Sequence, residues 1–462
     1  MPARVVSALQ FFPRGGSSHV ARALARELPA HGWAVTLLSG SRRDLGGQAD
    51  ARHFYAGLDA RTVDFDAALA AADPLDPPPG AAPMQPSYED RPGAPDVVFA
   101  KLDDAAYERQ VAAWMRALSG AGAARADILH LHHLTPLHAA AALVAPEVPV
   151  VGHLHGTELL MLEAIAAGPP AGWRHADAWA RRMGEWARGC ARLLVLSPSQ
   201  IARATRLLDI DPERCAVVPN GFDPAQIRRL TVDRAAHWRT HLVEQPRGWR
   251  PGEPPGSIRY GPQDVAGLAA GPVILSVGRF TAVKRTGLLI EAFALARERF
   301  AQPASLVLVG GHPGEWEGEH PLQTVERIGA RGVYVAGWHE HDTLPLFLSA
   351  ADLLALASVR EQFGQVLVEA MAAELPLVAV DRFGPAEIVE HGRTGWLVAP
   401  DDRDALAEAL VAAANDPVEL ARRGAAARAV ALERYAWPAL AGRVASLFDE
   451  VSSSSRASAG SA

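Results

Sequence analysis

Residues 353–371 read LLALASVREQFGQVLVEAM, and this stretch decides the fold. It opens with a short apolar run of strand length, Leu353 to Leu356, and Gly364 precedes a helix-length run that is apolar on almost all sides. A strand, a loop and a buried helix in this order are typical of a parallel sheet with crossover helices. Ligands of such sheets bind beyond the carboxyl ends of the strands, so the loop that carries Glu361 is a candidate site.

The same alternation extends along the chain on both sides of an irregular, Pro-rich stretch at 244–268. It predicts an α/β protein with two facing, Rossmann-like, doubly wound parallel-sheet domains and an interdomain cleft. Strands are expected near 4–9, 34–39, 127–131, 149–154, 192–196 and 215–218, and then near 272–277, 305–310, 333–335, 353–356, 377–380 and 395–398. Helices in the first half are expected near 17–30, 106–119, 173–189 and 198–208.

Four segments follow from this pattern. An N-terminal domain is expected at 1–262, with a Pro-rich surface insertion at about 73–100, and a C-terminal domain at 263–436. The Ser/Ala/Gly tail at 452–462 is expected to be disordered.

Composition excludes several function classes. The chain has 462 residues, is 49% hydrophobic and 21% charged, and has a formal net charge of -7 without a basic run, so a nucleic-acid partner is not expected. No apolar stretch reaches the roughly 18 residues of a membrane span, and no signal-peptide pattern opens the sequence. Two cysteines without a CxxC pattern agree with a reducing compartment, so we expect a soluble, cytoplasmic protein.

Lysine is scarce, and one of the two lysines stands in a candidate loop. Of the 45 cationic side chains only Lys101 and Lys284 are lysines. Lys284 and Arg279 follow the strand expected at 272–277 and flank a short strand-to-helix loop. Arginine as a planar fork and lysine as a compact charge can together hold the two phosphoryl groups of a diphosphate, although two solvated surface cations would give the same pattern.

Gly15 and Gly16 lie between the first strand and the first helix. Glycines let a ligand approach the backbone, and the amides of a helix start attract a phosphate or the reacting end of a sugar. A tight connection without a ligand would also use glycine here. The loop is not GxGxxG, and no acidic residue directly follows the second strand, so a nicotinamide site is disfavoured.

Four histidines lie at two strand ends, His130 with His132 and His153 with His155. Each pair has HxH spacing, which places both rings on one face of a strand, so a metal-dependent hydrolase is one alternative. The sequence offers no cysteine pair and no HExxH motif to complete such a site. Hydrogen-bonded structural histidines fit better, and His155, which precedes a glycine, suits a neutral hydrogen-bonding role.

Glu361 and Glu369 have seven residues between them. Gly364 should open the helix, which places Glu361 in the loop and Glu369 about one and a half turns into the helix. The helix start offers free amides to an anion, and carboxylates accept hydrogen bonds from vicinal hydroxyls such as those of a sugar or a ribose. Carboxylates on a largely buried helix need such partners.

Taken together, these residues resemble the retaining GT-B glycosyltransferases of family 4 over nearly the whole chain. The segments that carry the resemblance are Gly15-Gly16, His155-Gly156, Val218 to Asp223, Gly278-Arg279 with Lys284, Glu361 to Glu369, Gly384 to Glu387 and Gly392 to Val398. The stretch from Tyr435 to Trp437 and the helix after it resemble the terminal segment of that family, which implies that 437–451 returns to the first domain.

The resemblance implies a nucleoside-diphosphate sugar as donor and no cofactor or metal ion. Arg279 and Lys284 would stabilise the leaving diphosphate, and Glu369 would hold the ribose diol. His155 would contact the donor sugar near the reacting centre. Gly15 and Gly16 would let the diphosphate or the acceptor come close. The donor sugar would be held by Glu361 and by the segment Phe363, Gly364, Gln365 and Val366.

The resemblance also implies retention of configuration through attack on the same face. The acidic balance favours a small, soluble acceptor over a membrane lipid, although His19, Arg22 and Arg26 on the first helix leave peripheral membrane binding open. A related sugar-nucleotide epimerase is a further alternative. The chain departs from the family pattern at Glu374 and at Phe383, where that family usually has glycine.

Overall fold

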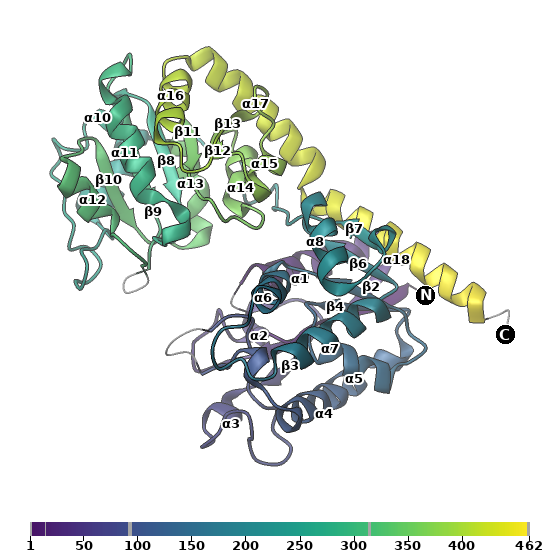
Figure 1. Cartoon of the computed structure of the whole chain (residues 1–462). Helices are drawn as coiled ribbons and strands as arrows, with labels where there is room; N and C mark the ends of the chain where they lie inside the picture. Colours follow the sequence, from purple (N-terminus) through teal and green to yellow (C-terminus); the bar gives the residue numbers. More distant parts are fainter. Residues whose placement is uncertain (1, 14, 91–94, 313–315, 460–462) are drawn as a thin grey trace. The chain divides into compact units, whose positions relative to one another are not determined.

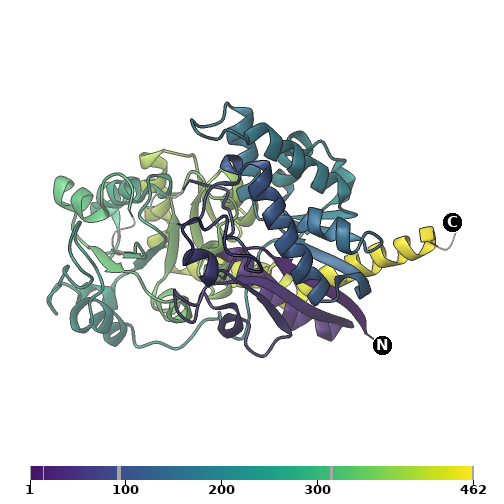
Figure 2. The ribbon, with the colours of Figure 1, turned by 90° about the horizontal axis from the view of Figure 1, so that it is seen from below.

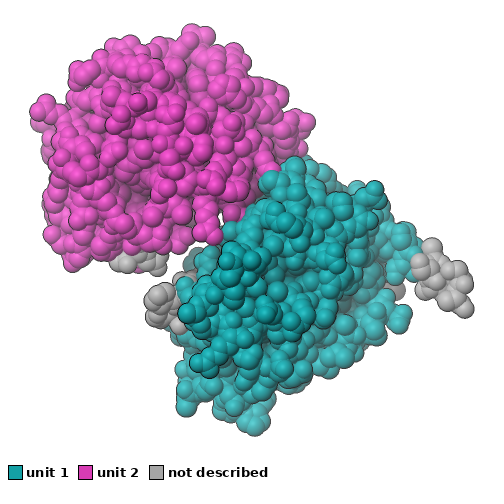
Figure 3. Space-filling view, in the orientation of Figure 1, with its two compact units in different colours: residues 1–220, 437–462 teal, residues 221–436 magenta. Residues whose placement is uncertain are grey.

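The computed structural model describes residues 2–13, 15–90, 95–312 and 316–459. The chain forms two compact units, and in each a parallel sheet is covered by helices (Figures 1 and 2). Unit 1 comprises Met1–Asn220 and Trp437–Ala462, and unit 2 comprises Gly221–Ala436 (Figure 3). The strand pattern therefore predicted the two-sheet α/β architecture correctly.

The expected domain boundary at 262/263 was wrong, because residues 221–262 belong to unit 2. Trp249 is buried in the core of unit 2, and its indole N–H donates to the Gly311 carbonyl at 2.7 Å. Arg234 forms an ion pair with Asp352 at 2.8 Å. A Pro-rich composition indicates irregular backbone, and here irregular backbone wraps a sheet that lies later in the sequence.

Unit 1 contains a seven-stranded parallel sheet in the order β3-β2-β1-β4-β5-β6-β7. All six expected strands of this half are present, and the unexpected one is β3, an edge strand in which only Val63 is buried. A half-exposed strand of this kind lacks the apolar run on which sequence reasoning depends. The strands are β1 (Ala3–Leu9), β2 (Trp33–Ser41), β3 (Ala60–Asp64), β4 (Ile128–His132), β5 (Val150–His153), β6 (Arg192–Val195) and β7 (Cys215–Val217).

Helices cover both faces of this sheet. Alternate side chains of β1 point to opposite faces and pack on different helices. Val5 packs with α1 and α18, whereas Val6 and Ala8 pack with α4 and α5. The α-helices are α1 (Gly16–Glu27), α2 (Ala51–Phe54), α3 (Asp66–Leu69), α4 (Asp104–Gly120), α5 (Leu137–Val144), α6 (Thr157–Ala166), α7 (Ala176–Gly189), α8 (Pro198–Leu208) and α18 (Trp437–Ala459). Short 3-10 turns are η1 (Leu28–His31), η2 (Phe99–Lys101), η3 (Ala123–Arg125) and η4 (Pro212–Arg214).

The expectation of a surface insertion at 73–100 holds only in part: residues 73–82 are exposed or half-buried, whereas 83–88 and 98–100 are buried, and 91–94 lie outside the described residues. Met84, Tyr88 and Phe99 are all at most 5% exposed. The Gln85 side chain accepts a hydrogen bond from the Phe12 amide at 2.8 Å, and the Tyr88 hydroxyl donates to the Leu134 carbonyl at 2.8 Å. Phe12 and Leu134 follow β1 and β4, so this segment lies against the carboxyl ends of the two central strands.

The expectation of a disordered tail at 452–462 was wrong for 452–459, which continue helix α18; residues 460–462 lie outside the described part. Ser452 is buried, and the Ser454 hydroxyl donates to the Glu450 carbonyl one turn earlier at 2.9 Å. Helix α18 packs on unit 1, where Phe448 meets the Trp33 ring at a centroid distance of 5.2 Å. Composition alone did not show that a packed helix precedes and supports these serines.

Unit 2 contains a six-stranded parallel sheet in the order β10-β9-β8-β11-β12-β13, and all six expected strands are present. The strands are β8 (Val273–Val277), β9 (Ser305–Val309), β10 (Val333–Gly337), β11 (Leu353–Leu356), β12 (Leu377–Val380) and β13 (Gly395–Val398). Strands β9, β11 and β12 are buried along their whole length, which explains why near-continuous apolar runs revealed them.

The helices of unit 2 precede β8, connect the strands or follow β13. They are α9 (Arg234–Arg239), α10 (Gly267–Ala270), α11 (Thr286–Ala296), α12 (Pro321–Ile328), α13 (Leu344–Ala350), α14 (Gln365–Ala372), α15 (Phe383–Ile388), α16 (Arg403–Ala414) and α17 (Pro417–Arg434). Shorter turns are η5 (Thr240–Glu244, a π-helix), η6 (Ala282–Lys284), η7 (Arg297–Arg299) and η8 (His341–Thr343). In the described part of the chain, no helix has the length and apolar character that crossing a bilayer requires.

Among the described residues of unit 2, four non-glycine residues have a positive φ that favours glycine, namely Arg285, Glu374, Phe383 and Asp401. Glu374 has φ of +63° and Phe383 has φ of +52°. This left-handed region brings Cβ close to the following carbonyl oxygen. Glu374 and Phe383 are the positions at which the chain departs from the glycine of the family it resembles, so the departures change the side chain while the glycine-like backbone remains.

Replacing Glu374 by glycine should raise the free energy of unfolding by about 0.5–1 kcal/mol. Relief of the left-handed strain gains about 1–2 kcal/mol, and the greater freedom of glycine in the unfolded chain removes part of that gain. The ion pair of Glu374 with Arg428, at 3.4 Å and half exposed, adds little. Urea denaturation measures the change, and Glu374→Ala is the control, because it removes the ion pair but keeps the strain. A glycine variant no more stable than the alanine variant would contradict this account.

Candidate active site

In both sheets the strand order reverses at one place, between β1 and β4 in unit 1 and between β8 and β11 in unit 2. Ligands of doubly wound sheets bind at such switch points, beyond the carboxyl ends of the strands. Gly15 and Gly16 follow β1, and His132 ends β4. Lys284 and Glu361 follow β8 and β11. The sequence-predicted residues therefore lie around both switch points.

Lys284 and Glu361 form an ion pair at the switch point of unit 2. Their side chains are 18% and 19% exposed, so both remain accessible from solvent. The backbone joins the two loops, because the Val359 amide donates to the Val283 carbonyl at 3.0 Å. Arg279 lies exposed at the start of the same β8 loop. A cation held against a carboxylate, with a second cation five residues earlier in the sequence, can exchange its partner for an incoming phosphate.

The start of α14 lies directly after Glu361. Gly364 has φ of +101°, which requires glycine, and α14 begins at Gln365 as expected, with no side-chain cap at its first turn. Phe363 is buried, and the Gln365 side chain donates to the Gly221 carbonyl at 2.9 Å. Because the Gln365 side chain is engaged elsewhere, this segment, including Val366, can offer a ligand its backbone amides.

Glu369 is buried at 4% exposure, one turn beyond the start of α14. Its carboxylate contacts the His341 ring at 2.8 Å (Oε1 to Nε2). His341 begins η8 in the loop after β10, and its side chain is 61% exposed. Sequence reasoning missed His341, although it stands among polar residues just beyond a strand end, where a ligand contact is expected.

In unit 1 the four predicted histidines form a hydrogen-bonded chain through Ser7 of β1. His155 Nε2 lies 3.0 Å from His132 Nδ1, and His132 Nε2 lies 3.2 Å from Ser7 Oγ. Ser7 Oγ lies 3.5 Å from His130 Nδ1, and His130 Nε2 lies 3.2 Å from His153 Nδ1. Each neutral ring has one N–H and one lone pair, so each contact fixes the tautomer of the next ring.

Burial keeps these rings neutral. It lowers the pKa of His130 to about 3. Burial, and then the charges of the neighbouring histidines, lower the pKa values of His132, His153 and His155 well below the usual range. His155, at the outer end of these hydrogen bonds, is therefore a neutral ring that contacts His132.

Glu158 is a functional candidate that sequence reasoning missed. Its carboxylate is fully buried, accepts a hydrogen bond from the His155 amide at 3.0 Å and lies 3.4 Å from His133 Nδ1. Burial opposes its ionisation, but the charge and hydrogen bond of His133 outweigh this and leave the Glu158 pKa lowered. An acidic residue in the first turn of an apolar helix that follows a strand was the available signal.

Three of these rings could also hold a metal ion. The ligand nitrogens of His130, His132 and His153 all lie within 4.8 Å of one another, and all three side chains are fully buried. Among the described residues this group contains no carboxylate or thiolate. His130 and His132 are hydrogen-bonded at both ring nitrogens, whereas the buried Nε2 of His153 has no hydrogen-bond partner among the described residues.

Gly15 and Gly16 leave open space at the end of β1. Gly15 precedes α1, which has no side-chain cap and no acidic residue in its first turn. A Cβ added at either glycine would meet nothing within 4 Å. The protein's own packing therefore does not require these glycines, and the space above them is available to a ligand.

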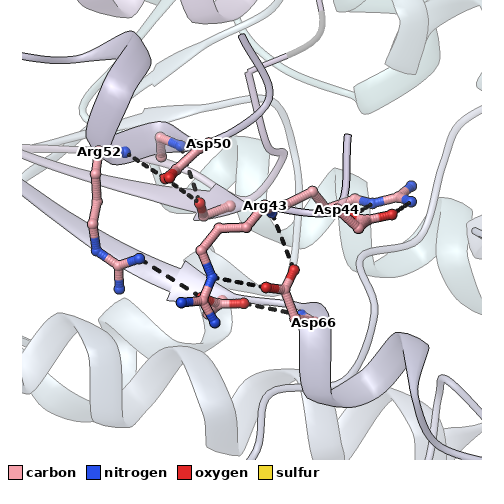
Figure 4. A network of polar contacts seen from close by, with 9 residues as sticks. Arg43, Asp44, Asp50, Arg52 and Asp66 are labelled. Carbon is pink, nitrogen blue, oxygen red and sulfur yellow. Dashed lines mark hydrogen bonds and ion pairs between the residues drawn. The ribbon is translucent and has the colours of Figure 1, made fainter. Parts of the chain in front are cut away.

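The loop after β2 is held by a network of charges (Figure 4). Arg43 contacts Asp66 at 2.8 Å and Asp64 at 3.0 Å, while Asp50 accepts a hydrogen bond from the Arg52 amide at 3.0 Å. Arg42 is likewise paired with Asp44. Because carboxylates neutralise these arginines, this loop offers no unopposed positive charge to an anionic ligand.

Two named proteins have sequences similar to that of this chain. Alpha-D-kanosaminyltransferase of Streptomyces kanamyceticus is 31% identical over 189 residues, which are 40% of this chain and 47% of that protein. The match thus spans less than half of that relative's length. Glycogen synthase of Mycobacterium tuberculosis is 28% identical over 326 residues, which are 70% of this chain and 69% of that protein.

Solved structures share the fold. The Anabaena protein HepE, crystallised with UDP and glucose, superimposes with a TM-score of 0.66 at 18% identity, over 97% of this chain and 100% of that one. Sucrose-phosphate synthase of Thermosynechococcus elongatus gives a TM-score of 0.66 at 18% identity, over 98% and 100%. The two sheets with these neighbours define the GT-B glycosyltransferase fold.

Two family models match the chain. The model "Glycosyltransferase Family 4" matches residues 14–226, and the model "Glycosyl transferases group 1" matches residues 267–430. The chain belongs to this family of glycosyltransferases, as its motifs indicated. Among the alternatives, the match favours a transferase over the metal-dependent hydrolase.

Proposed function

We propose that the protein is a retaining glycosyltransferase that moves a sugar from a nucleoside-diphosphate sugar to a small acceptor without a metal ion, in the cytoplasm. The observation that carries the proposal is the accessible Lys284–Glu361 ion pair at the switch point of unit 2, with Arg279 in the same loop. Structural neighbours crystallised with UDP and with UDP-glucose support a donor of this kind.

In the proposed reaction the bond between the anomeric carbon and the phosphate oxygen breaks. Arg279 and Lys284 stabilise the negative charge that develops on the leaving diphosphate, which a metal ion would otherwise have to do. The acceptor oxygen attacks the same face of the sugar, and its proton passes to the leaving phosphate. Atoms and charge therefore balance without a separate protein base.

The remaining residues hold the donor. Glu361 and the amides at the start of α14 bind hydroxyls of the transferred sugar, and Glu369 binds the ribose diol in place of His341. The neutral His155 hydrogen-bonds the donor sugar near the reacting centre. The open space over Gly15 and Gly16 admits the diphosphate or the acceptor.

A thermal-shift screen of UDP, GDP and ADP in the presence of EDTA tests the donor class. We expect one nucleotide at 100 times its Kd to stabilise the protein by about 2.7 kcal/mol, which raises the melting temperature by roughly 5–10 °C. The matched control is Glu369→Ala, which should weaken the shift because it removes the ribose contact. No shift with any nucleotide would contradict the proposal, and so would a strict requirement for added metal. Detection of a glycosylated acceptor excludes the epimerase alternative.

A further inference from the structure

Phe383 is an exposed aromatic side chain in a strained backbone. It is the first residue of α15, directly beyond the carboxyl end of β12, and its φ is +52°. It is 36% exposed, which makes it one of the few large apolar side chains of the described chain that reach solvent. Strained residues persist where the surroundings enforce them, and they cluster at ligand sites.

The backbone at Phe383 is fixed against the loop of Glu361. The Gly384 amide donates to the Glu361 carbonyl at 3.1 Å. A Cβ added at Gly384 would lie 2.0 Å from the Phe363 carbonyl oxygen, so the two loops are in direct contact. The Arg382 guanidinium lies over the Phe383 ring, 4.8 Å from its centroid. The ring is thus held in place beside the loop that carries Glu361 and Phe363.

Packing does not account for an aromatic ring at this position. Glu374 has the same left-handed backbone, but it lies at the other end of β12, and its polar side chain pairs with Arg428. That comparison shows that the conformation does not call for an aromatic ring. An exposed aromatic ring on a strained residue adds little to the stability of the free protein. A ligand that covers the ring would bury its apolar surface and so gain binding energy.

We propose that Phe383 forms one wall of the donor-sugar pocket. Its ring packs on the C–H face of the transferred sugar, while Glu361 holds hydroxyls of the same sugar. The Arg382 guanidinium, which lies over the ring, fixes the orientation of the ring. A flat apolar wall discriminates sugars by the orientation of their hydroxyls, so Phe383 is a specificity-determining residue. The inference rests on the proposed function and adds the group that selects the sugar.

Isothermal titration calorimetry tests this role of Phe383. It compares the affinities of Phe383→Gly and of the parent for UDP, GDP and ADP and for their glucose conjugates. Glycine suits the backbone here, so the variant should fold and melt at a higher temperature than the parent. We expect its affinity for the free nucleotide to be unchanged and its affinity for the matching nucleotide sugar to fall about tenfold. Phe383→Tyr, which keeps the ring, should retain the affinity for the nucleotide sugar.

The matched control is Glu374→Gly, which relieves the same strain away from the loop and should leave both affinities unchanged. An equal affinity of parent and Phe383→Gly for the nucleotide sugar would overturn the inference and leave the proposed function standing. An equal loss of affinity for nucleotide and nucleotide sugar would also overturn it, because the ring would then act only on loop structure. A parent protein that binds none of the six compounds would overturn the proposed function itself.

Discussion

Replacing Lys284 by alanine is expected to lower kcat/KM by about 10²–10³-fold, because the variant loses a positioned charge that stabilises the leaving diphosphate. The loss corresponds to about 2.7–4 kcal/mol of transition-state stabilisation, which is typical when one such donor is removed. The variant should still fold, since the Glu361 carboxylate that loses its partner is 19% exposed and can be hydrated. Transfer rates at limiting donor concentration measure the effect, together with the melting temperature.

The chain provides its own control for Lys284. Lys101, the other lysine, is also paired with a carboxylate, 2.5 Å from Asp90, but it lies in unit 1 and not in the Glu361 loop. Lys101→Ala should therefore leave kcat/KM within about twofold of the parent, because half-exposed ion pairs contribute little. Similar transfer rates for the two alanine variants would show that Lys284 is a surface cation without a role in the reaction.

The second large effect concerns pH. We expect the protein to lose stability steeply between pH 6.5 and pH 5, because buried histidines that are neutral in the folded state take up protons when the chain unfolds. Burial lowers the folded pKa of His130 to about 3 and that of His138 to about 4, whereas the unfolded value is 6.5. His132, His153 and His155 shift in the same direction.

The sign follows from the lowered folded pKa values. Above pH 6.5 neither state binds these protons, so the folded state keeps its full stability; below pH 6.5 only the unfolded state binds them. His130 alone then costs about 2 kcal/mol at pH 5, and the lowered pKa values of the other buried histidines act in the same direction.

Urea titrations followed by tryptophan fluorescence at pH values from 5 to 7.5 measure this dependence. A His130→Asn variant should show a slope of unfolding free energy against pH that is smaller by up to one proton. A denaturation midpoint that stays constant from pH 5 to pH 7 would contradict the neutral, buried state of these rings.

The fold was largely predictable from sequence, since its central strands are buried on both faces. Strands such as Leu353 to Leu356 therefore appear as apolar runs without alternation. The edge strand β3 was missed because its side chains are mostly exposed. The buried course of Met84 and Tyr88 was missed because proline content reports on backbone geometry and not on burial.

The candidate site was predictable where residue type and position coincide. Lys284 and Glu361 follow adjacent strands of the sheet, so topology brings them together. The contacts of His341 and Glu158 were not predictable in this way. His341 reaches Glu369 from the loop after another strand, and Glu158 reaches the His155 amide only because the start of α6 turns back on the strand end.

The return of α18 to unit 1 has a consequence for synthesis. Unit 1 is encoded in two pieces, and the cover of Trp33 includes Phe448 of α18. All of unit 2 therefore emerges from the ribosome while unit 1 still lacks α18. While the 216 residues Gly221–Ala436 are translated, part of the apolar face of residues 1–220 is not yet covered by α18. During this interval a nascent chain would need the protection of chaperones.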